Sequence, residues 1–509
     1  MQFTNLCNLL PRKLHIEKHL LPLTFLVILF AFLTQLNIME LRGEESRRGM
    51  IAIEMYARGE WIVPTMHGWN YYNKPPLWNW ILAASIWLFG SAKEWVLRLP
   101  GILSILLTGY LIFGCLAKEV SREAAILGGL FFLTCADLLF FGSVLSAEID
   151  PFLTLILFIQ SISIYYGFYH KKQWHFLVAW IMLAIGLLTK GLPSLVFFGL
   201  TILGIAIMER RWKWWWCLPQ WIGGFLAAFL IGSYFYIYQQ SAPLDVFLIN
   251  LLDDALQKSA LEDRPSRILS QIFTFPFDLL KITLPWSLLL FFFFKKKMIH
   301  PVAKVPLLRF CVIFLIFNVW IYWISSNTHN RYLYPFFPFI SILTAGIFCY
   351  LIQNKSVVPN FWKRKTIFKF RTALLLILLL GIARLVYNFA IQPIQAKSFH
   401  HRVLASTLLE KTNGAPIHLT GELFIQEANP EFGSILLQWR QIELPPQLSY
   451  KIPYYLYLQS GTVMEYQPKA KRGSYYLIFK NEFVNKNGSV LHTFFENWTN
   501  REMLLVQWD

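Results

Sequence analysis

The stretch from Asp150 to Tyr169, DPFLTLILFIQSISIYYGFY, contains no charged side chain after its first position. An α-helix of about 20 apolar residues is long enough to cross the roughly 30 Å of hydrocarbon in a bilayer. The stretch is therefore predicted to be a membrane-spanning helix with an acidic residue at one end. Apolar runs of similar length occur on both sides of it, and we expect about eleven such helices in all. They lie near residues 20–38, 97–116, 123–143, 149–168, 174–190, 192–208, 217–238, 270–294, 306–325, 332–352 and 372–391.

The composition of the whole chain agrees with this interpretation. Of its 509 residues, 56% are hydrophobic and 15% are charged, whereas about a quarter of the residues of a soluble protein are charged. We therefore expect an all-α polytopic membrane protein. The six cysteines have no metal-type spacing, so the sequence gives no indication of a zinc site.

The net charge of +17 indicates membrane topology and not a nucleic-acid partner, because the basic residues form short clusters in alternate connections. Basic connections remain on the cytoplasmic side of a membrane. The other connections are therefore expected on the periplasmic side of a bacterial inner membrane. These outer segments are residues 39–96, 143–148 and 239–267, and everything after about 392.

The first outer loop, residues 39–96, contains a semi-apolar stretch at 77–90. This stretch is too short to cross a bilayer, and it follows Pro75 and Pro76. We expect it to form a helix that lies along the membrane surface.

The composition changes near residue 396, where mixed polar sequence with strand-like runs begins. The chain is therefore predicted to consist of a membrane domain, residues 1–395, and a small soluble periplasmic α/β domain, residues 396–509. The strand-like runs lie at 417–423 and 475–479.

Charged residues gather in the segments predicted to lie outside. On a helix, Glu44 shares a face with Arg47 and Arg48. This arrangement fits an exposed salt bridge, and it fits equally a carboxylate that the arginines orient for general-base chemistry.

Asp150 and Lys190 lie at the outer ends of two predicted spans. An ionisable residue at such a position is costly unless it is paired or solvated, which makes it a candidate for function. For Asp150 the alternative is a carboxylate that stabilises a helix N-terminus. Lys74 and Arg331 also lie on the outer side, where a basic residue is often an interfacial anchor.

Together these residues resemble motifs of the GT-C superfamily, in the group of protein O-mannosyltransferases and lipid A aminoarabinose transferases. Five segments correspond in order: Glu44-Glu45-Ser46-Arg47, Tyr71 to Leu77, Arg98-Leu99-Pro100, Asp150-Pro151 and Thr189-Lys190-Gly191. The turn from Arg331 to Pro335 is similar to the late outer-loop motif of that family. The resemblance covers about residues 20–350. The leading aspartate of the family corresponds to Glu44 in this chain, and this difference affects the expected geometry of the base. A glutamate that the family associates with metal binding corresponds to Asn73, and this difference affects the expected metal dependence.

The resemblance implies a GT-C fold and a sugar donor that is joined to a polyprenyl phosphate. In this scheme Lys74, Lys190 and Arg331 bind the phosphate. Glu44, or Asp150 in its place, takes the proton of the acceptor, and Arg47 lies beside this base. The acceptor then displaces the phosphate in a single step that inverts the anomeric carbon. The remaining expected substrate contacts are Tyr71, Tyr332, Asn73 and Glu45.

The scheme requires no cofactor, although a divalent metal held by Glu44 and Asp150 is a second option. The implied partners are the lipid-linked donor, a lipid or protein acceptor and the bilayer. A transporter or flippase of a lipid-linked anion is the alternative function. Transporters typically contain internal repeats and charges near the bilayer midplane, whereas the charges here gather at one face and the two halves of the chain differ.

Overall fold

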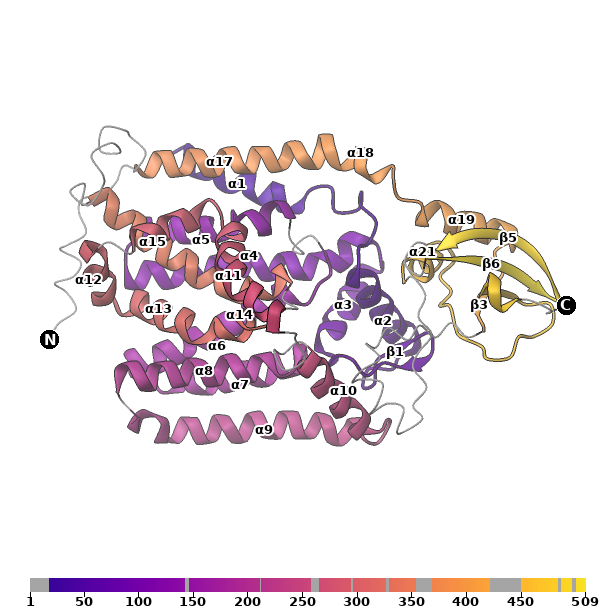
Figure 1. Ribbon diagram of the computed structural model, residues 1–509, viewed down its shortest axis with the longest axis horizontal. Helices are drawn as coiled ribbons and strands as arrows, with labels where there is room; N and C mark the ends of the chain where they lie inside the picture. Colours follow the sequence, from indigo (N-terminus) through magenta and orange to yellow (C-terminus); the bar gives the residue numbers. More distant parts are fainter. Residues whose placement is uncertain are drawn as a thin grey trace.

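A computed structural model describes residues 18–141, 146–210, 212–257, 265–293, 296–325, 329–353, 369–421, 450–483, 487–496 and 500–509. Most of these residues are helical. Figure 1 shows the long helices lying side by side along the longest axis, with a sheet from the C-terminal part of the chain at one end. The predicted combination of a helical membrane part and a small C-terminal α/β part is confirmed.

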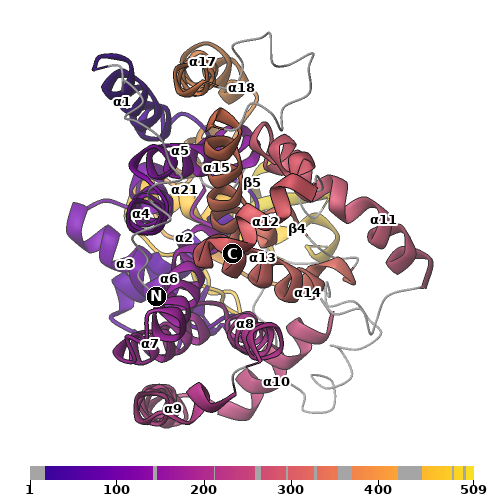
Figure 2. The same ribbon diagram turned by 90° about the vertical axis from the view of Figure 1, so that its left-hand side faces the viewer.

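Long apolar helices form the bundle because their side chains are apolar around most of the helix surface. The principal helices are α1 (Leu20–Leu33), α4 (Glu94–Glu119), α5 (Arg122–Leu133), α6 (Asp150–Tyr169), α7 (Trp174–Lys190), α8 (Pro193–Glu209), α9 (Leu218–Tyr238), α13 (Pro306–Asn318), α15 (Phe337–Gln353) and α17 (Phe370–Val386). Shorter helices connect or extend them: α10 (Leu244–Gln257), α11 (Pro265–Ile282), α12 (Lys296–Lys304), α14 (Trp320–Trp323) and α18 (Gln392–Ala396). Figure 2 views the bundle along the helices, with α1 and α17 together at one margin and α9 at the opposite one.

The number of spans differs from the expected eleven. In the described part of the chain, six helical segments are long and apolar enough to cross a membrane, or seven if one bent pair counts as a span. The expected spans at 20–38, 174–190 and 192–208 correspond to the shorter apolar helices α1, α7 and α8. The multi-pass character is confirmed, but the count of eleven stays a prediction.

The span predicted at 270–294 is wrong as a single helix. Helix α11 ends at Ile282, and a short 3₁₀ helix, Trp286–Phe292, continues at an angle of 119°. Pro285 lies at the break, and proline has no N–H to continue the helical ladder. The carbonyl of Leu284, which the break frees, instead accepts a hydrogen bond from the backbone N–H of Ala136, with N and O 2.8 Å apart.

The span predicted at 123–143 is also interrupted. Helix α5 ends at Leu133, and a π-helical turn follows at Asp137–Phe141. The carboxylate of Asp137 accepts a hydrogen bond from the Tyr334 hydroxyl at 2.7 Å. Asp137 is therefore a buried hydrogen-bonding residue between two elements of the bundle.

The first outer loop folds into α2 (Glu44–Arg58), a short hairpin and α3 (Leu77–Phe89). The helix expected at 77–90 is thus present, directly after the two prolines. The hairpin strands, β1 (Thr65–Met66) and β2 (Trp69–Asn70), are antiparallel. The buried carboxylate of Glu54 fixes the hairpin on α2, because it accepts hydrogen bonds from the Thr65 hydroxyl at 2.9 Å and the His67 backbone N–H at 2.5 Å.

The C-terminal sheet has the strand order β3-β4-β6-β5. Strands β3 (Ile417–Leu419) and β4 (Tyr475–Phe479) are parallel, and β5 (Gly488–Glu496) and β6 (Arg501–Trp508) complete the sheet with antiparallel pairing. Helices α19 (His401–Lys411) and α21 (Lys451–Ser460) pack together beside it.

The sheet and its helices share one hydrophobic core with the first outer loop. Met50 and Leu82 of the loop belong to the same buried cluster as Ala405, Tyr454 and Leu477. Polar contacts reinforce this core, because the Tyr454 hydroxyl donates a hydrogen bond to the carbonyl of Ala92 at 2.7 Å. The shared core holds the predicted soluble part against the loop that carries the candidate site.

Candidate functional site

Asp150 and Lys190 meet because α6 and α7 form an antiparallel hairpin. The connection between them is short, so the first residue of α6 lies beside the last residue of α7. The ammonium of Lys190 donates a hydrogen bond to Asp150 Oδ1, and both side chains are buried. Gly191 ends α7 with a φ of +84°, which favours glycine, and a side chain there would collide with Leu251.

Arg331 joins this pair from the start of a 3₁₀ helix, Asn330–Phe336. Its Nη1 lies 2.8 Å from Glu148 Oε1, and its Nε lies 3.6 Å from Asp150 Oδ2. The ring of Tyr332 lies under the Lys190 ammonium, with 4.1 Å between Nζ and the ring centroid. Two cations therefore lie against one aromatic ring, and each is paired with a carboxylate.

A second group of charges lies on the first turns of α2. Glu44 forms ion pairs with Arg47 and Arg48, which follow it by three and four residues and therefore lie on the same face of the helix. Arg48 also donates a hydrogen bond to the hydroxyl of Tyr71 at 3.2 Å. The guanidinium of Arg47 lies 5.1 Å from the ring centroid of Tyr450, which comes from the C-terminal part of the chain.

Glu148 lies between the two groups of charges. Burial, together with the neighbouring carboxylates of Asp150 and Glu44, raises the pKa of its carboxyl to about 7, while Arg331 and Arg48 oppose the shift. Its titration thus depends on charges from α2, from α6 and from the Arg331 turn. The helix α3 fixes the same segment, because Trp78 Nε1 donates a hydrogen bond to the carbonyl of Ala147 at 2.9 Å.

Glu45 lies on the other side of the first turn of α2 and is fully buried. Its Oε1 is 2.6 Å from Arg98 Nε, and its Oε2 accepts a hydrogen bond from the backbone N–H of Arg42 at 2.9 Å. It also accepts one from the backbone N–H of Ala147 at 3.2 Å. In this arrangement Glu45 ties the first outer loop to α4 and to the turn before α6.

Lys74 and Asn73 precede α3. The Lys74 side chain is buried, whereas Asn73 is exposed. The structure thus brings Asp150, Lys190, Arg331 and Tyr332 together in one group of contacts and Glu44, Arg47 and Tyr71 in another, and charges of both groups act on Glu148. The substrate roles expected for these residues, and for Glu45, Lys74 and Asn73, stay predictions.

A cleft of about 640 Å³ opens beside Glu44. The start of α2 forms one wall, and Phe399, Lys451 and the end of β5 form the others. The Glu44 side chain is 28% exposed, while that of Asp150 is 3% exposed. Of the two carboxylates, Glu44 is therefore the one that a molecule in this cleft could reach.

Comparison with known proteins gives consistent results. Residues 73–238 match the family model described as dolichyl-phosphate-mannose-protein mannosyltransferase. An undecaprenyl phosphate-alpha-4-amino-4-deoxy-L-arabinose arabinosyl transferase from Erwinia tasmaniensis is 32% identical over 194 residues, which cover 36% of this chain and 34% of that relative. An uncharacterised protein from Aquifex aeolicus is 27% identical over 65% of this chain and 63% of its own length.

The fold comparison extends over nearly the whole chain. The crystal structure of ArnT from Cupriavidus metallidurans bound to undecaprenyl phosphate matches with a TM-score of 0.71 at 16% identity, covering 96% of this chain and 98% of that one. The chain therefore has the ArnT fold, and its likeness to the mannosyltransferase family model covers residues 73–238. The chain spans only about a third of the length of the arabinosyl transferase that it matches.

The part of the chain that the structure describes contains no apparent set of metal ligands. Among the residues that the structure describes, no three His, Cys, Asp or Glu side chains come together as a metal group. Glu44 and Asp150, the two carboxylates considered as metal ligands, instead face arginines and a lysine. No step proposed below depends on a metal.

Sequence reasoning gave no role to Glu148, placed Arg98 only within the motif Arg98-Leu99-Pro100, and did not name Tyr450. Glu148 had a local signal, since a second carboxylate lies two residues before Asp150 at a predicted membrane boundary. Arg98 had one too, as an arginine at the start of an apolar run. Tyr450 had none, because it reaches Arg47 only through the packing of a part of the chain some 400 residues away in sequence.

Proposed function

We propose that this protein is an integral-membrane glycosyltransferase that moves a sugar from a polyprenyl-phosphate donor to an acceptor on the periplasmic side of a bacterial inner membrane. The observation that carries the proposal is the convergence of Lys190 and Arg331 on Asp150 at one end of the bundle. The names of the arabinosyl transferase relatives and the undecaprenyl phosphate in the ArnT structure support the same donor class.

The two cations suit a phosphate leaving group. As the glycosidic bond breaks, negative charge develops on the phosphate oxygen, and prepositioned cations in a partly dry site stabilise that charge by several kcal/mol. Arg331 can offer two parallel N–H donors, and Lys190 offers a compact charge. Asp150 and Glu148 hold both cations in place before the donor arrives.

Glu44 is the proposed general base. Its carboxylate faces the cleft, whereas the Asp150 carboxylate is held between Lys190 and Arg331. A base must lie within hydrogen-bond reach of the acceptor proton, and of Glu44 and Asp150 only Glu44 lines the cleft. Attack by the deprotonated acceptor on the anomeric carbon displaces the lipid phosphate in one step, which inverts that carbon.

The acceptor is proposed to enter through the cleft between α2 and the C-terminal part of the chain. Lys451 and His400 line it together with Phe399 and Phe494. This mixture of basic and aromatic side chains suits an acceptor that has both polar and apolar parts, such as a glycolipid. The periplasmic orientation rests on the basic clusters at the opposite ends of the helices.

Release of sugar from a radiolabelled polyprenyl-phosphate donor by the purified full-length protein tests the proposal. We expect turnover by the wild type and its loss in Asp150→Ala and Lys190→Ala. Arg309→Ala is the matched control, because Arg309 pairs with Glu209 at 2.9 Å and Glu209 ends α8, the helix that starts just after Lys190. An equal loss in the control would indicate general damage to the bundle.

The alternative, a transporter or flippase of a lipid-linked anion, gives a different outcome in the same preparation. A transporter in vesicles moves the intact donor across the bilayer without cleaving it. Movement of uncleaved donor, combined with no sugar release under any acceptor condition, would reject the glycosyltransferase.

A further inference from the structure

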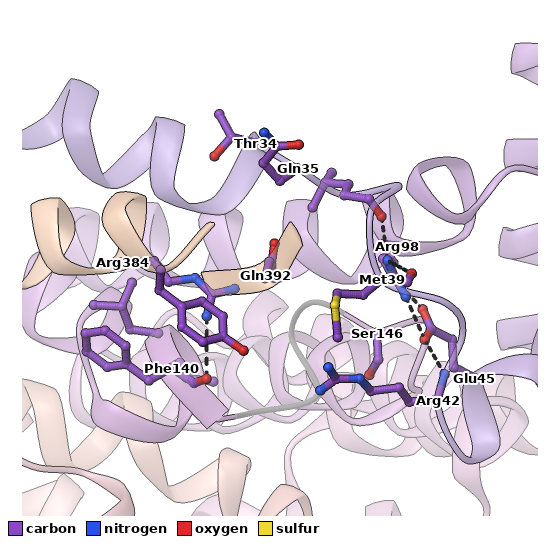
Figure 3. A pocket seen from close by; sticks show the side chains of 14 residues that line it. Thr34, Gln35, Met39, Arg42, Glu45, Arg98, Phe140, Ser146, Arg384 and Gln392 are labelled. Carbon is purple, nitrogen blue, oxygen red and sulfur yellow. Dashed lines mark hydrogen bonds and ion pairs between the residues drawn. The ribbon is translucent and has the colours of Figure 1, made fainter. Parts of the chain in front are cut away.

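A second basic pocket lies on the far side of the first turn of α2 from Glu44. It has a volume of about 80 Å³ and lies between the ends of α1 and α17, the start of α4 and the π-helical turn after α5. Figure 3 shows Arg42 and Arg384 extending toward this space from opposite walls, with Gln392 above it. None of these three residues belongs to the proposed donor site.

The pocket carries an excess of positive charge. Three arginines line it, namely Arg42, Arg98 and Arg384, together with one carboxylate, that of Glu45. Glu45 pairs with Arg98. Among the described residues, no carboxylate pairs with either of the other two arginines.

Arg384 is the decisive residue because its side chain is only 2% exposed. Its described partners are neutral: Nη1 lies 3.4 Å from the carbonyl oxygen of Phe140, and the guanidinium lies 4.9 Å from the ring centroid of Tyr387. A buried guanidinium without an anion is costly. A buried cation that points into a cavity therefore indicates that an anion belongs there.

Gln392 provides a second, independent sign of a ligand. The residue is 7% exposed, and its side-chain oxygen has no hydrogen-bond partner among the described residues. Burial of an amide oxygen without a hydrogen-bond partner is costly. The same amide, with its nitrogen and oxygen exchanged, presents N–H donors to an anion.

The position of the pocket identifies the kind of anion. Thr34 and Gln35 follow α1, Gln392 follows α17, and Asn388 joins the two helices through a hydrogen bond to the carbonyl of Ala31 at 3.0 Å. The pocket thus lies beside the ends of α1 and α17. Apolar side chains on these helices are exposed beside it, among them Phe30, Leu379 and Val386. Such surfaces accept acyl chains while the pocket accepts a headgroup.

We propose that this pocket binds the phosphate of an anionic membrane phospholipid, separately from the donor site. The bound phosphate would neutralise Arg384 and Arg42, while the acyl chains would lie against α1 and α17. Because Glu45 lines the pocket and shares the first turn of α2 with Glu44, the lipid would also brace the turn that carries the proposed base.

Native mass spectrometry of the full chain in detergent, with phosphatidylglycerol or phosphatidylcholine added, tests this proposal. We expect the wild type to retain phosphatidylglycerol in preference to phosphatidylcholine. Arg384→Gln and Arg42→Gln should each weaken that retention at least fivefold. The two variants change different elements, so a folding defect in one does not remove the test. Arg371→Gln, an exposed position on the same helix α17, should bind like the wild type.

Two further measurements distinguish a lipid phosphate from a soluble anion, and this pocket from the proposed donor site. Lys190→Gln should lose sugar transfer yet keep phosphatidylglycerol, which distinguishes this proposal from the proposed function. Stabilisation against heat by inorganic phosphate, with none by the lipid, would assign the pocket to a soluble anion and overturn the proposal. Unchanged lipid retention in both arginine variants would overturn it as well.

Discussion

Asp150 and Lys190 lie 40 residues apart in the sequence and form a buried ion pair, because the helices that they begin and end are antiparallel neighbours. A buried ion pair gains little net stability from its own attraction. The pair instead fixes a position, because it holds the Lys190 ammonium beside Arg331 and over the ring of Tyr332.

The two members of this pair are expected to have opposite effects on the binding of a lipid phosphate. Asp150→Asn frees Lys190 and Arg331 from a competing carboxylate, so the variant should bind polyprenyl phosphate several-fold more tightly while its turnover falls. Lys190→Gln removes a phosphate partner, so both binding and turnover should fall, the latter by about 100-fold or more. Binding of the fluorescent lipid phosphate to purified protein measures the first effect, and weaker binding by Asp150→Asn would contradict it.

Glu148 is expected to make stability depend on pH. Burial raises the pKa of its carboxyl to about 7 in the folded protein, above the ordinary value of 4.5. The folded state therefore holds this proton more tightly than the unfolded state does. The stabilisation is fully present below about pH 4.5, falls as the pH rises toward 7, and is gone above that pH.

Glu148→Gln removes this titration. The melting temperature of the wild type, relative to that of the variant, should thus decrease between about pH 5 and 7 and then level off. Thermal denaturation of both proteins in the same detergent and buffers measures the difference. A difference that stays constant across this range would show that Glu148 does not titrate there.

Glu45 is expected to act mainly through stability. Breaking a buried ion pair by removal of one partner leaves the other charge uncompensated and costs about 3 to 5 kcal/mol. Glu45→Ala should therefore lower the melting temperature strongly, since Arg98 loses both of its carboxylate contacts. The double variant Glu45→Ala with Arg98→Met should recover part of that loss.

The same measurement separates this role from the substrate contact that the motif predicts for Glu45. A substrate contact alone would raise the KM for the donor without lowering the melting temperature. A variant with that pattern would show that Glu45 meets the donor directly.

The parts of this structure that the sequence could predict are those set by local physics. Most of the helices could be predicted from uncharged apolar runs that are long enough to cross a bilayer. The candidate site could be predicted from isolated charges at the ends of these runs, such as Asp150 and Lys190. The double proline before Leu77 placed the start of α3. These signals work because burying an unpaired charge or an unsatisfied backbone group in a membrane is costly.

The rest depends on packing between distant segments. Hydrophobicity alone could not show that the predicted span at 270–294 turns sharply near Pro285, because the apolar pattern continues across the break. The contact of Tyr450 with Arg47 and the shared core of the first loop and the sheet arise only when the chain is folded. The basic pocket near Arg384 was missed for the same reason, since its arginines come from three separate elements.

Glu44 provides the most direct test of the chemistry. If it is the base, Glu44→Gln should lower kcat by about 100-fold or more and leave the KM for the donor nearly unchanged, because the phosphate contacts remain. Glu44→Asp keeps a carboxylate one methylene shorter and should retain part of the activity. Glu465→Gln is the matched control, since Glu465 pairs with Arg58 at 2.7 Å, away from the cleft.

Steady-state kinetics with a labelled donor and a saturating acceptor give both constants. Equal losses in Glu44→Gln and Glu44→Asp, together with a raised KM, would indicate that Glu44 positions Arg47 and Arg48 for the donor and that the proton goes elsewhere. Asp150 would then be the carboxylate to test, because it pairs with both of the cations that are proposed to bind the leaving phosphate.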